Sequence, residues 1–119
     1  PELLRGIADG WLGARLPQRI GIAKAKHMIF TAATINAIKA ESIGLISEVV
    51  PYEQLIIEAY SIAEKIKHTG PQARGMQKKQ INAQLPAFDL EIFQRSTQSE
   101  EAKESIDAFI NKREPIWQC

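Results

Sequence analysis

The chain has 119 residues and a formal net charge of +1 at pH 7, and 45% of its residues are apolar. A chain of this length makes one domain, and folding would bury roughly two-thirds of its unfolded surface, enough for one modest core. The small net charge gives no strong attraction to nucleic acid or to an anionic membrane, so we expect neither as a partner. We expect no metal site, because the two histidines are isolated and zinc needs three or four converging ligands.

Several features predict a soluble, cytoplasmic protein. No apolar run approaches the roughly 18 to 20 residues of a membrane span, and the first residues lack the apolar stretch of a signal peptide. The single cysteine, Cys119, has no partner within the chain. A disulfide scaffold is therefore excluded, and a reducing compartment is expected. Because the chain opens on Pro1 rather than Met, we expect a processed chain or a piece excised from a longer one.

Short helices separated by Gly and Pro are predicted in the first half of the chain. The first twenty residues are rich in glycine, with a helical turn expected over 11–16 that stops at Pro17. Apolar residues at helical spacing predict a helix that begins at Ile22. A further helix is expected over 37–43, with Gly44 in the left-handed position that follows a helix end.

One segment departs from the helical pattern. Residues 45–50 read LISEVV, are rich in β-branched residues and stop at Pro51, which favours a strand. A strand needs a partner for its backbone N–H and C=O groups. The nearest suitable segment is 29–35, which reads IFTAATI. We therefore expect at most one small two-stranded ribbon.

Four helices are predicted downstream. The strongest pattern runs over 52–67, where apolar residues recur at helical spacing, and a more polar helix follows over 72–84. Asp89 and Ser99 are placed to cap two further helices. The last of these is expected to place apolar residues and Arg113 on one face. Composition and periodicity thus predict a mainly α fold without indicating a function.

The N-terminal segment holds one candidate acid or base. A glutamate at position 2, beside Leu3 and Leu4, would have a raised pKa if it were buried, which suits proton transfer at carbon. The alternative is that Glu2 is simply a surface charge, as isolated glutamates usually are. The glycines of the following GIADGWLG match no phosphate-binding loop, because no strand precedes them and no Gly-Lys-Ser/Thr follows.

A second candidate lies near the C-terminus. Lys112 and Arg113 stand close to Phe109 and Trp117, and this mixture of cations and aromatic rings suits a phosphorylated ligand with a flat ring. The alternative is a charged helix end whose aromatic side chains pack into a core.

Taken in order, three stretches resemble the C-terminal half of the enoyl-CoA hydratase/isomerase (crotonase) family. They are PELLRGIADGWLGARLPQRIG, AKAKHMIFTAATINAIKAESIGLISEVVPYEQL and SEEAKESIDAFINKREPIW. The resemblance runs over essentially the whole chain. It implies the helical C-terminal region of the crotonase fold without its N-terminal sheet core. Residues 1–21 would form an active-site loop and helix, and residues 22–119 a helical and oligomerisation part.

The resemblance also implies an activity. Crotonase-like enzymes bind acyl-CoA thioesters, without a further cofactor, and stabilise an enolate with two backbone N–H groups. The hydratases among them add water across the 2,3 double bond with two glutamates as acid and base. Glu2 matches the second of these, which lies in a Pro-Glu pair. Gly10 matches a glycine of the following turn, whose amide helps to place the reacting water.

The resemblance also implies a role for the C-terminal candidates. Phe109, Lys112 and Arg113 match the helix segment that approaches the CoA moiety in the family, sometimes that of a neighbouring subunit. Because family members are commonly trimers or pairs of trimers, the resemblance also implies a homo-oligomer.

The leading hypothesis is therefore a piece of an enoyl-CoA hydratase. Alone it should be inactive, because the oxyanion hole and the first glutamate belong to the family's N-terminal part. Other crotonase reactions remain as alternatives: double-bond isomerisation, thioester hydrolysis or dehalogenation. A hypothesis of a different class is a non-catalytic helical module whose apolar faces serve assembly.

Overall fold

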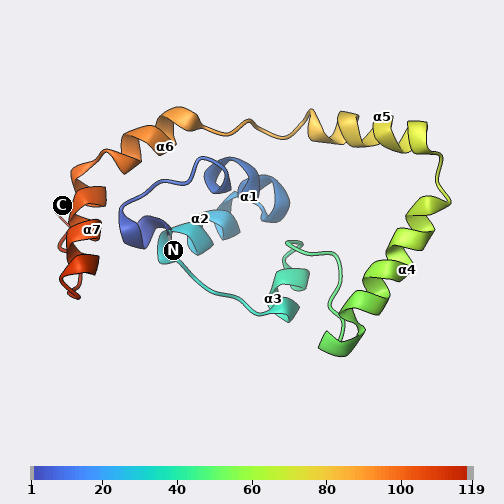
Figure 1. Cartoon of the computed structure of the whole chain (residues 1–119), viewed down its shortest axis with the longest axis horizontal. Coiled ribbons are helices and arrows are strands. Elements are labelled where there is room, and N and C mark those ends of the chain that lie inside the picture. The colour runs from blue at the N-terminus through green and yellow to red at the C-terminus, as the bar shows by residue number, and fades with distance from the viewer. Residues whose placement is uncertain (1, 118–119) are drawn as a thin grey trace. The chain divides into compact units, whose positions relative to one another are not determined.

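The computed structural model describes residues 2–117 (Figure 1). Within that range every regular element is a helix, which confirms the prediction of a mainly α fold. None of these helices has the length and apolar character needed to cross a membrane. Pro1 and Cys119, on which two of the sequence expectations rest, lie outside the described residues.

The helices belong to two compact units. The first unit joins the segment up to Asn36 to the segment from Ala87 onwards, and the second spans Ala37–Pro86. In chain order the elements are η1 (Glu2–Arg5), α1 (Leu12–Ile20), α2 (Ile22–Thr31), α3 (Ala37–Ser42), η2 (Tyr52–Gln54), α4 (Leu55–Lys67), α5 (Pro71–Asn82), α6 (Leu90–Thr97) and α7 (Glu100–Ile110), where η denotes a 3-10 helix.

The first unit has a small core. Helices α1 and α2 pack against each other, and α7 contacts both η1 and α6. The buried apolar side chains of this unit are Leu16, Ile20, Ala25, Ala102 and Ala108. Three of the five are alanines, which allow close helix approach but remove little apolar area from water. Large side chains such as Phe109, which is 86% exposed, remain outside this core.

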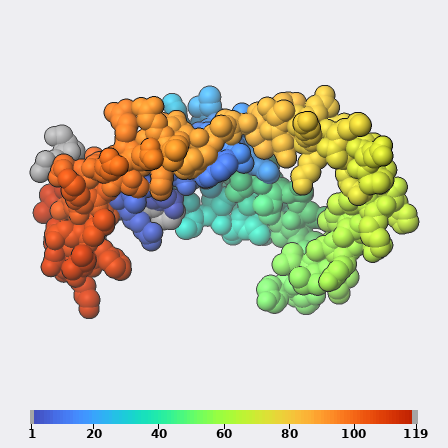
Figure 2. Space-filling view, turned by 45° about the horizontal axis from the view of Figure 1, so that its top comes forward, coloured from blue at the N-terminus to red at the C-terminus, as the bar shows by residue number. Residues whose placement is uncertain are grey.

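The N-terminal segment lies against the C-terminal helices (Figures 1 and 2). The Asp89 N–H donates to the Gly10 carbonyl at 3.0 Å, and the Ser96 hydroxyl donates to the Ala8 carbonyl at 3.3 Å. Gly6 has φ +63°, and a Cβ there would come within 2.8 Å of Glu101. Residues far apart in the sequence thus form one unit through backbone contacts that need glycine.

The second unit contains α3, α4 and α5. Helix α3 ends as predicted, with Gly44 at φ +79° and its N–H bonded to the Glu41 carbonyl at 2.9 Å. Between α4 and α5, the Arg74 guanidinium donates to the Ile66 carbonyl at 2.6 Å and to the Thr69 carbonyl at 3.2 Å. Arg74 therefore satisfies carbonyl groups at the end of α4 and ties α5 to it.

The expected strand over 45–50 does not form. These residues are bends and irregular chain, and the Val49 N–H donates to the Glu41 carboxylate at 3.1 Å instead of to a neighbouring strand. Its expected partner, 29–35, is partly used by α2, which runs to Thr31. The β-branched composition of the segment was misleading because a strand needs a second strand, and no strand forms within residues 2–117.

Two helix boundaries also differ from the expectation. Pro17 lies inside α1 rather than ending it. Pro17 has no N–H to donate to the preceding turn, but the helix continues past it, and its carbonyl accepts the Gly21 N–H at 2.9 Å. Helix α7 ends at Ile110, so Arg113 is not on a face of that helix. The cause is Lys112, whose left-handed φ of 51° reverses the chain.

The predicted caps of the last two helices are confirmed. The Asp89 carboxylate accepts the Ile92 N–H at 3.0 Å, and the Ser99 hydroxyl accepts the Ala102 N–H at 3.2 Å. Each cap satisfies one of the N–H groups that have no partner within the helix.

Substitutions at two helix ends test the role of left-handed residues in stability. Ala32 follows α2 with φ 48°, where a Cβ is unfavourable, whereas Gly44 holds the same position after α3. Ala32→Gly should raise the free energy of unfolding by about 0.5 to 1 kcal/mol, and Gly44→Ala should lower it by about 1 kcal/mol. Urea unfolding followed by circular dichroism measures both. Equal effects of the same sign would contradict the assignment.

Candidate functional site

Glu2 is the first residue of η1 and is partly exposed. The pKa of its carboxyl lies below the usual value, chiefly because the backbone N–H of Glu2 hydrogen-bonds it. The condition for a raised pKa was burial beside Leu3 and Leu4, and it is not met here, since Leu4 is 61% exposed. Glu2 is therefore ionised at neutral pH in this structure, and its lowered pKa makes it a weaker base than an unperturbed glutamate.

Gly10 is buried where the N-terminal segment meets the start of α6. A Cβ at this position would lie 2.5 Å from the Asp89 carbonyl oxygen and 2.6 Å from the Phe88 ring. No larger residue fits without displacing backbone. Among the described residues the Gly10 N–H has no hydrogen-bond partner, while its carbonyl accepts from Asp89. The geometry thus explains the glycine by packing and leaves its catalytic role a prediction.

Asp9 positions the start of α1, a role that the sequence analysis missed. Its carboxylate accepts the Trp11 N–H at 2.5 Å and the Leu12 N–H at 2.6 Å. The Trp11 ring lies 5.3 Å from the Phe88 ring, and the Arg15 guanidinium lies 3.9 Å from the centre of the Trp11 ring. An aspartate three residues before a helix start is the sequence signal that could have identified this cap.

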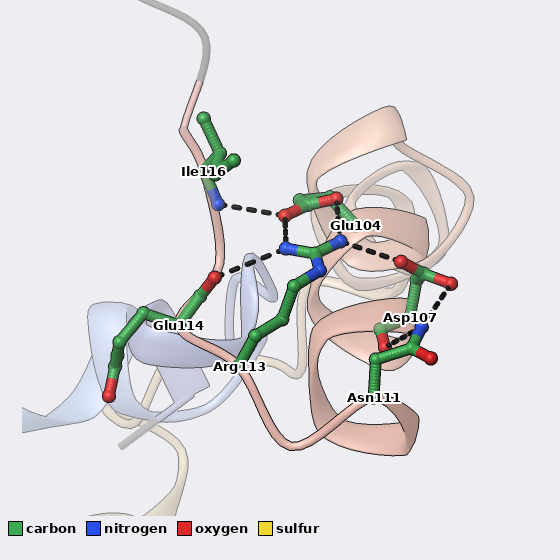
Figure 3. A network of polar contacts seen from close by, with 6 residues as sticks. All are labelled: Glu104, Asp107, Asn111, Arg113, Glu114 and Ile116. Atoms are coloured by element: carbon green, nitrogen blue, oxygen red, sulfur yellow. Dashed lines mark hydrogen bonds and ion pairs between the residues drawn. The ribbon is translucent and has the colours of Figure 1, made fainter.

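At the C-terminus, the chain folds back on α7 through a group of charges that we call the clasp, formed by Glu104, Asp107 and Arg113 (Figure 3). The Arg113 guanidinium donates to both Glu104 carboxylate oxygens, at 2.5 and 2.9 Å, and to Asp107 Oδ2 at 2.6 Å. It also donates to the Glu114 carbonyl at 3.1 Å, and the Ile116 N–H donates to Glu104 at 2.7 Å. The clasp therefore fixes residues 113–116 along the helix.

The clasp shifts the pKa values of Glu104 and Arg113. Arg113 and the Ile116 N–H lower the pKa of Glu104 to about 2, and Glu104 and Asp107 raise the pKa of Arg113. Glu104 and Arg113 are thus ionised at neutral pH, and the clasp places two carboxylate groups around one guanidinium. Such a group is a poor site for an anion.

The two neighbouring candidates have a different environment. Phe109 and Lys112 are exposed, and within residues 2–117 the Lys112 ammonium has no ion-pair partner. A cavity of about 590 Å³ lies between η1 and α7, with Leu4, Ile7, Phe109 and Arg113 among its lining residues. Of the predicted site residues, Phe109 and Arg113 line this cavity, whereas Glu2, Gly10 and Lys112 do not.

Comparisons with known proteins give the family. The enoyl-CoA hydratase/isomerase family pattern matches residues 1–119. A probable mitochondrial enoyl-CoA hydratase of Dictyostelium discoideum is 34% identical, over 98% of this chain and 45% of the relative. A short-chain-enoyl-CoA hydratase of Clostridium acetobutylicum is 37% identical, over 95% of this chain and 46% of the relative.

The fold comparison agrees. The crystal structure of carnitinyl-CoA hydratase from Mycobacterium avium matches with a TM-score of 0.82 and 29% identity, over 99% of this chain and 49% of that one. The chain belongs to the enoyl-CoA hydratase/isomerase family, as its resemblance predicted. It spans about half the length of the curated relatives it matches.

Two glycines of the N-terminal segment provide a matched test of the packing at Gly10. Gly10→Ala should lower the free energy of unfolding by about 1 to 3 kcal/mol, because the added Cβ overlaps Asp89 and Phe88. Gly13→Ala should raise it by about 0.5 to 1 kcal/mol, because Gly13 lies in α1 with open space around it. Denaturant unfolding distinguishes the two. A neutral Gly10→Ala would contradict the described contact.

The clasp predicts a specific dependence of stability on pH. The pKa of Glu104 is about 2 in the folded chain, against 4.5 for an unperturbed glutamate. Its contribution is therefore complete above about pH 4.5 and is lost as the pH falls towards 2. The stability difference between wild type and Glu104→Gln should shrink over this range in urea unfolding. Glu91→Gln, at an exposed pair, serves as control; a difference that stays constant with pH would contradict the assignment.

Proposed function

We propose that the chain is the C-terminal part of an enzyme that adds water to a 2,3-enoyl-CoA thioester. The observation that carries this proposal is the arrangement of the first unit, in which η1 contacts α7 and its residues Leu4 and Arg5 line one cavity with Phe109. The family match over the whole chain supplies the chemistry of the substrate.

In this proposal Glu2 is a general acid/base. An ionised carboxylate can take a proton from water as the water oxygen bonds to C3, while the first glutamate of the family delivers a proton to C2. The electron pair of the double bond moves towards the thioester carbonyl, which gives the enolate. The enolate is consumed when C2 takes up the proton. Glu2 is ionised at neutral pH, as the proton transfer from water requires. The Gly10 N–H is buried and has no hydrogen-bond partner among the described residues, so it is suited to hold the attacking water.

The CoA end of the substrate is proposed to meet the end of α7. There Phe109 offers an exposed ring and Lys112 an exposed ammonium, which suit a nucleotide base and a phosphate. The resemblance also assigned Arg113 to this site. Residues 1–21 would then supply the active-site segment, and 22–119 the remaining helices.

Assembly is a further part of the proposal. On α4 the side chains of Leu55, Ile56, Ile57 and Tyr60 are 52 to 70% exposed, and apolar groups exposed together favour association. A homo-oligomer, a trimer or hexamer as in the family, would cover such a face. This observation also supports the alternative of a non-catalytic assembly module. We keep a cytoplasmic location as a prediction.

The family contains isomerases as well as hydratases, so the reaction itself needs a test. In the full-length gene product, Glu2→Gln should lower kcat for crotonyl-CoA hydration by about 10² to 10⁴, because the amide cannot accept the proton. Glu91→Gln, on the exposed face of α6, should leave kcat unchanged. Unchanged hydration in Glu2→Gln would contradict the role of Glu2, and loss of isomerase activity alone would favour the isomerase.

The 119 residues alone should show no turnover. The resemblance places the two oxyanion-hole amides and the first glutamate in the family's other half, and removal of even one such amide costs on the order of a hundredfold. The same assay applied to the isolated chain measures this. Turnover by the isolated chain that Glu2→Gln abolishes would show a complete site and contradict the proposal.

A further inference from the structure

Most of the hydrogen-bonding capacity of the Arg113 guanidinium is used within its own chain. Both of its terminal nitrogens donate to carboxylates, and one donates to a backbone carbonyl as well. A phosphate that approached this guanidinium would have to displace Glu104 or Asp107, or bind beside their negative charges. The side chains of Arg113 and Glu104 are also only 35% and 26% exposed. Direct anion binding by Arg113 is therefore unfavourable.

The clasp adjoins a backbone turn that needs support. Lys112 has the left-handed φ of 51°, which is unfavourable for a residue with a Cβ. Two bonds close the turn: the Lys112 N–H to the Phe109 carbonyl at 3.3 Å, and the Arg113 N–H to the Ala108 carbonyl at 3.0 Å. The side chain of Arg113 then anchors the returning chain to α7 one and two turns back, at Asp107 and Glu104. Arg113 therefore holds Lys112 from its C-terminal side.

We propose that Arg113 is a positioning residue of the CoA site, which acts by fixing the left-handed turn at Lys112 and does not touch the ligand. This rests on the proposed function, in which Lys112 meets a phosphate of CoA. It revises the role that the resemblance gives to Arg113. The clasp sets the direction in which the Lys112 side chain leaves the end of α7. Glu104 and Asp107 therefore share the positioning role of Arg113.

A double-mutant cycle separates positioning from direct contact. CoA binding to the full-length gene product is measured by isothermal titration calorimetry for Lys112→Ala, Arg113→Ala and the double variant. Lys112→Ala and Arg113→Ala should each raise the Kd on the order of tenfold. If Arg113 acts through Lys112, the double variant should bind no more weakly than Lys112→Ala. Additive losses would show an independent contact and overturn the proposal.

Two further variants distinguish the two roles. Glu104→Gln weakens the clasp, so positioning predicts weaker CoA binding, whereas a direct role predicts tighter binding by the released guanidinium. Arg113→Lys keeps the charge but cannot form the bidentate pair with Glu104, so positioning predicts a loss close to that of Arg113→Ala. These variants also carry the test if Arg113→Ala does not fold, which thermal unfolding of each variant reveals.

The outcomes also separate this inference from the proposed function. No CoA binding by the wild-type protein would refute the proposed function. CoA binding that Lys112→Ala does not weaken, or that Glu104→Gln strengthens, would overturn the role of the clasp and leave the function intact. Lys103→Ala is the matched control, because Lys103 also lies on α7 but pairs with Glu100 at 2.6 Å. It should leave the Kd unchanged.

Discussion

The close backbone approach between Gly10 and the start of α6 is the constraint on which the first unit depends. It places the Gly10 carbonyl on the Asp89 N–H, and it leaves no room for a side chain at position 10. The same Asp89 caps α6 with its carboxylate. One aspartate thus joins the N-terminal segment to the C-terminal helices by its backbone and begins a helix with its side chain. The position of η1 beside α7 follows from this junction.

The second feature of the unit is the small amount of apolar surface that it buries. Its buried side chains are few and mostly small, while residues such as Phe109 and Ile110 remain exposed. Because hydrophobic stabilisation follows buried area, such a core is modest for two helix pairs. Polar contacts therefore carry more of the local order, as the clasp at the end of α7 illustrates.

Local rules predicted most of the helices. Asp89 and Ser99 were identified as caps and Gly44 as a left-handed residue because each acts within a few residues of its own position. The prediction of a strand over 45–50 was wrong, because a strand must pair with another segment of the chain. Its expected partner, 29–35, is partly taken up by α2. The end of α7 was placed too late because nothing local marks Lys112 as left-handed.

In the candidate site, too, features that depend on distant residues could not be predicted from local sequence. Residue chemistry marked Glu2 and the C-terminal group as candidates, and the resemblance to family motifs added Gly10 and gave each of them a role. No geometric argument from the sequence could have joined them. The clasp was missed because Glu104 and Arg113 are nine residues apart and meet only after the chain reverses. The lowered pKa of Glu2 was likewise hidden, since it depends on the backbone geometry of η1 rather than on its apolar neighbours.

The central claim is that the N-terminal segment and the end of α7 together form part of an acyl-CoA site. Amide hydrogen exchange of the full-length gene product, with and without CoA, tests it most directly. The account predicts that CoA slows exchange at both 2–10 and 109–113, with little change over α5. Slower exchange confined to α5, or no change at either segment despite saturation with CoA, would contradict it.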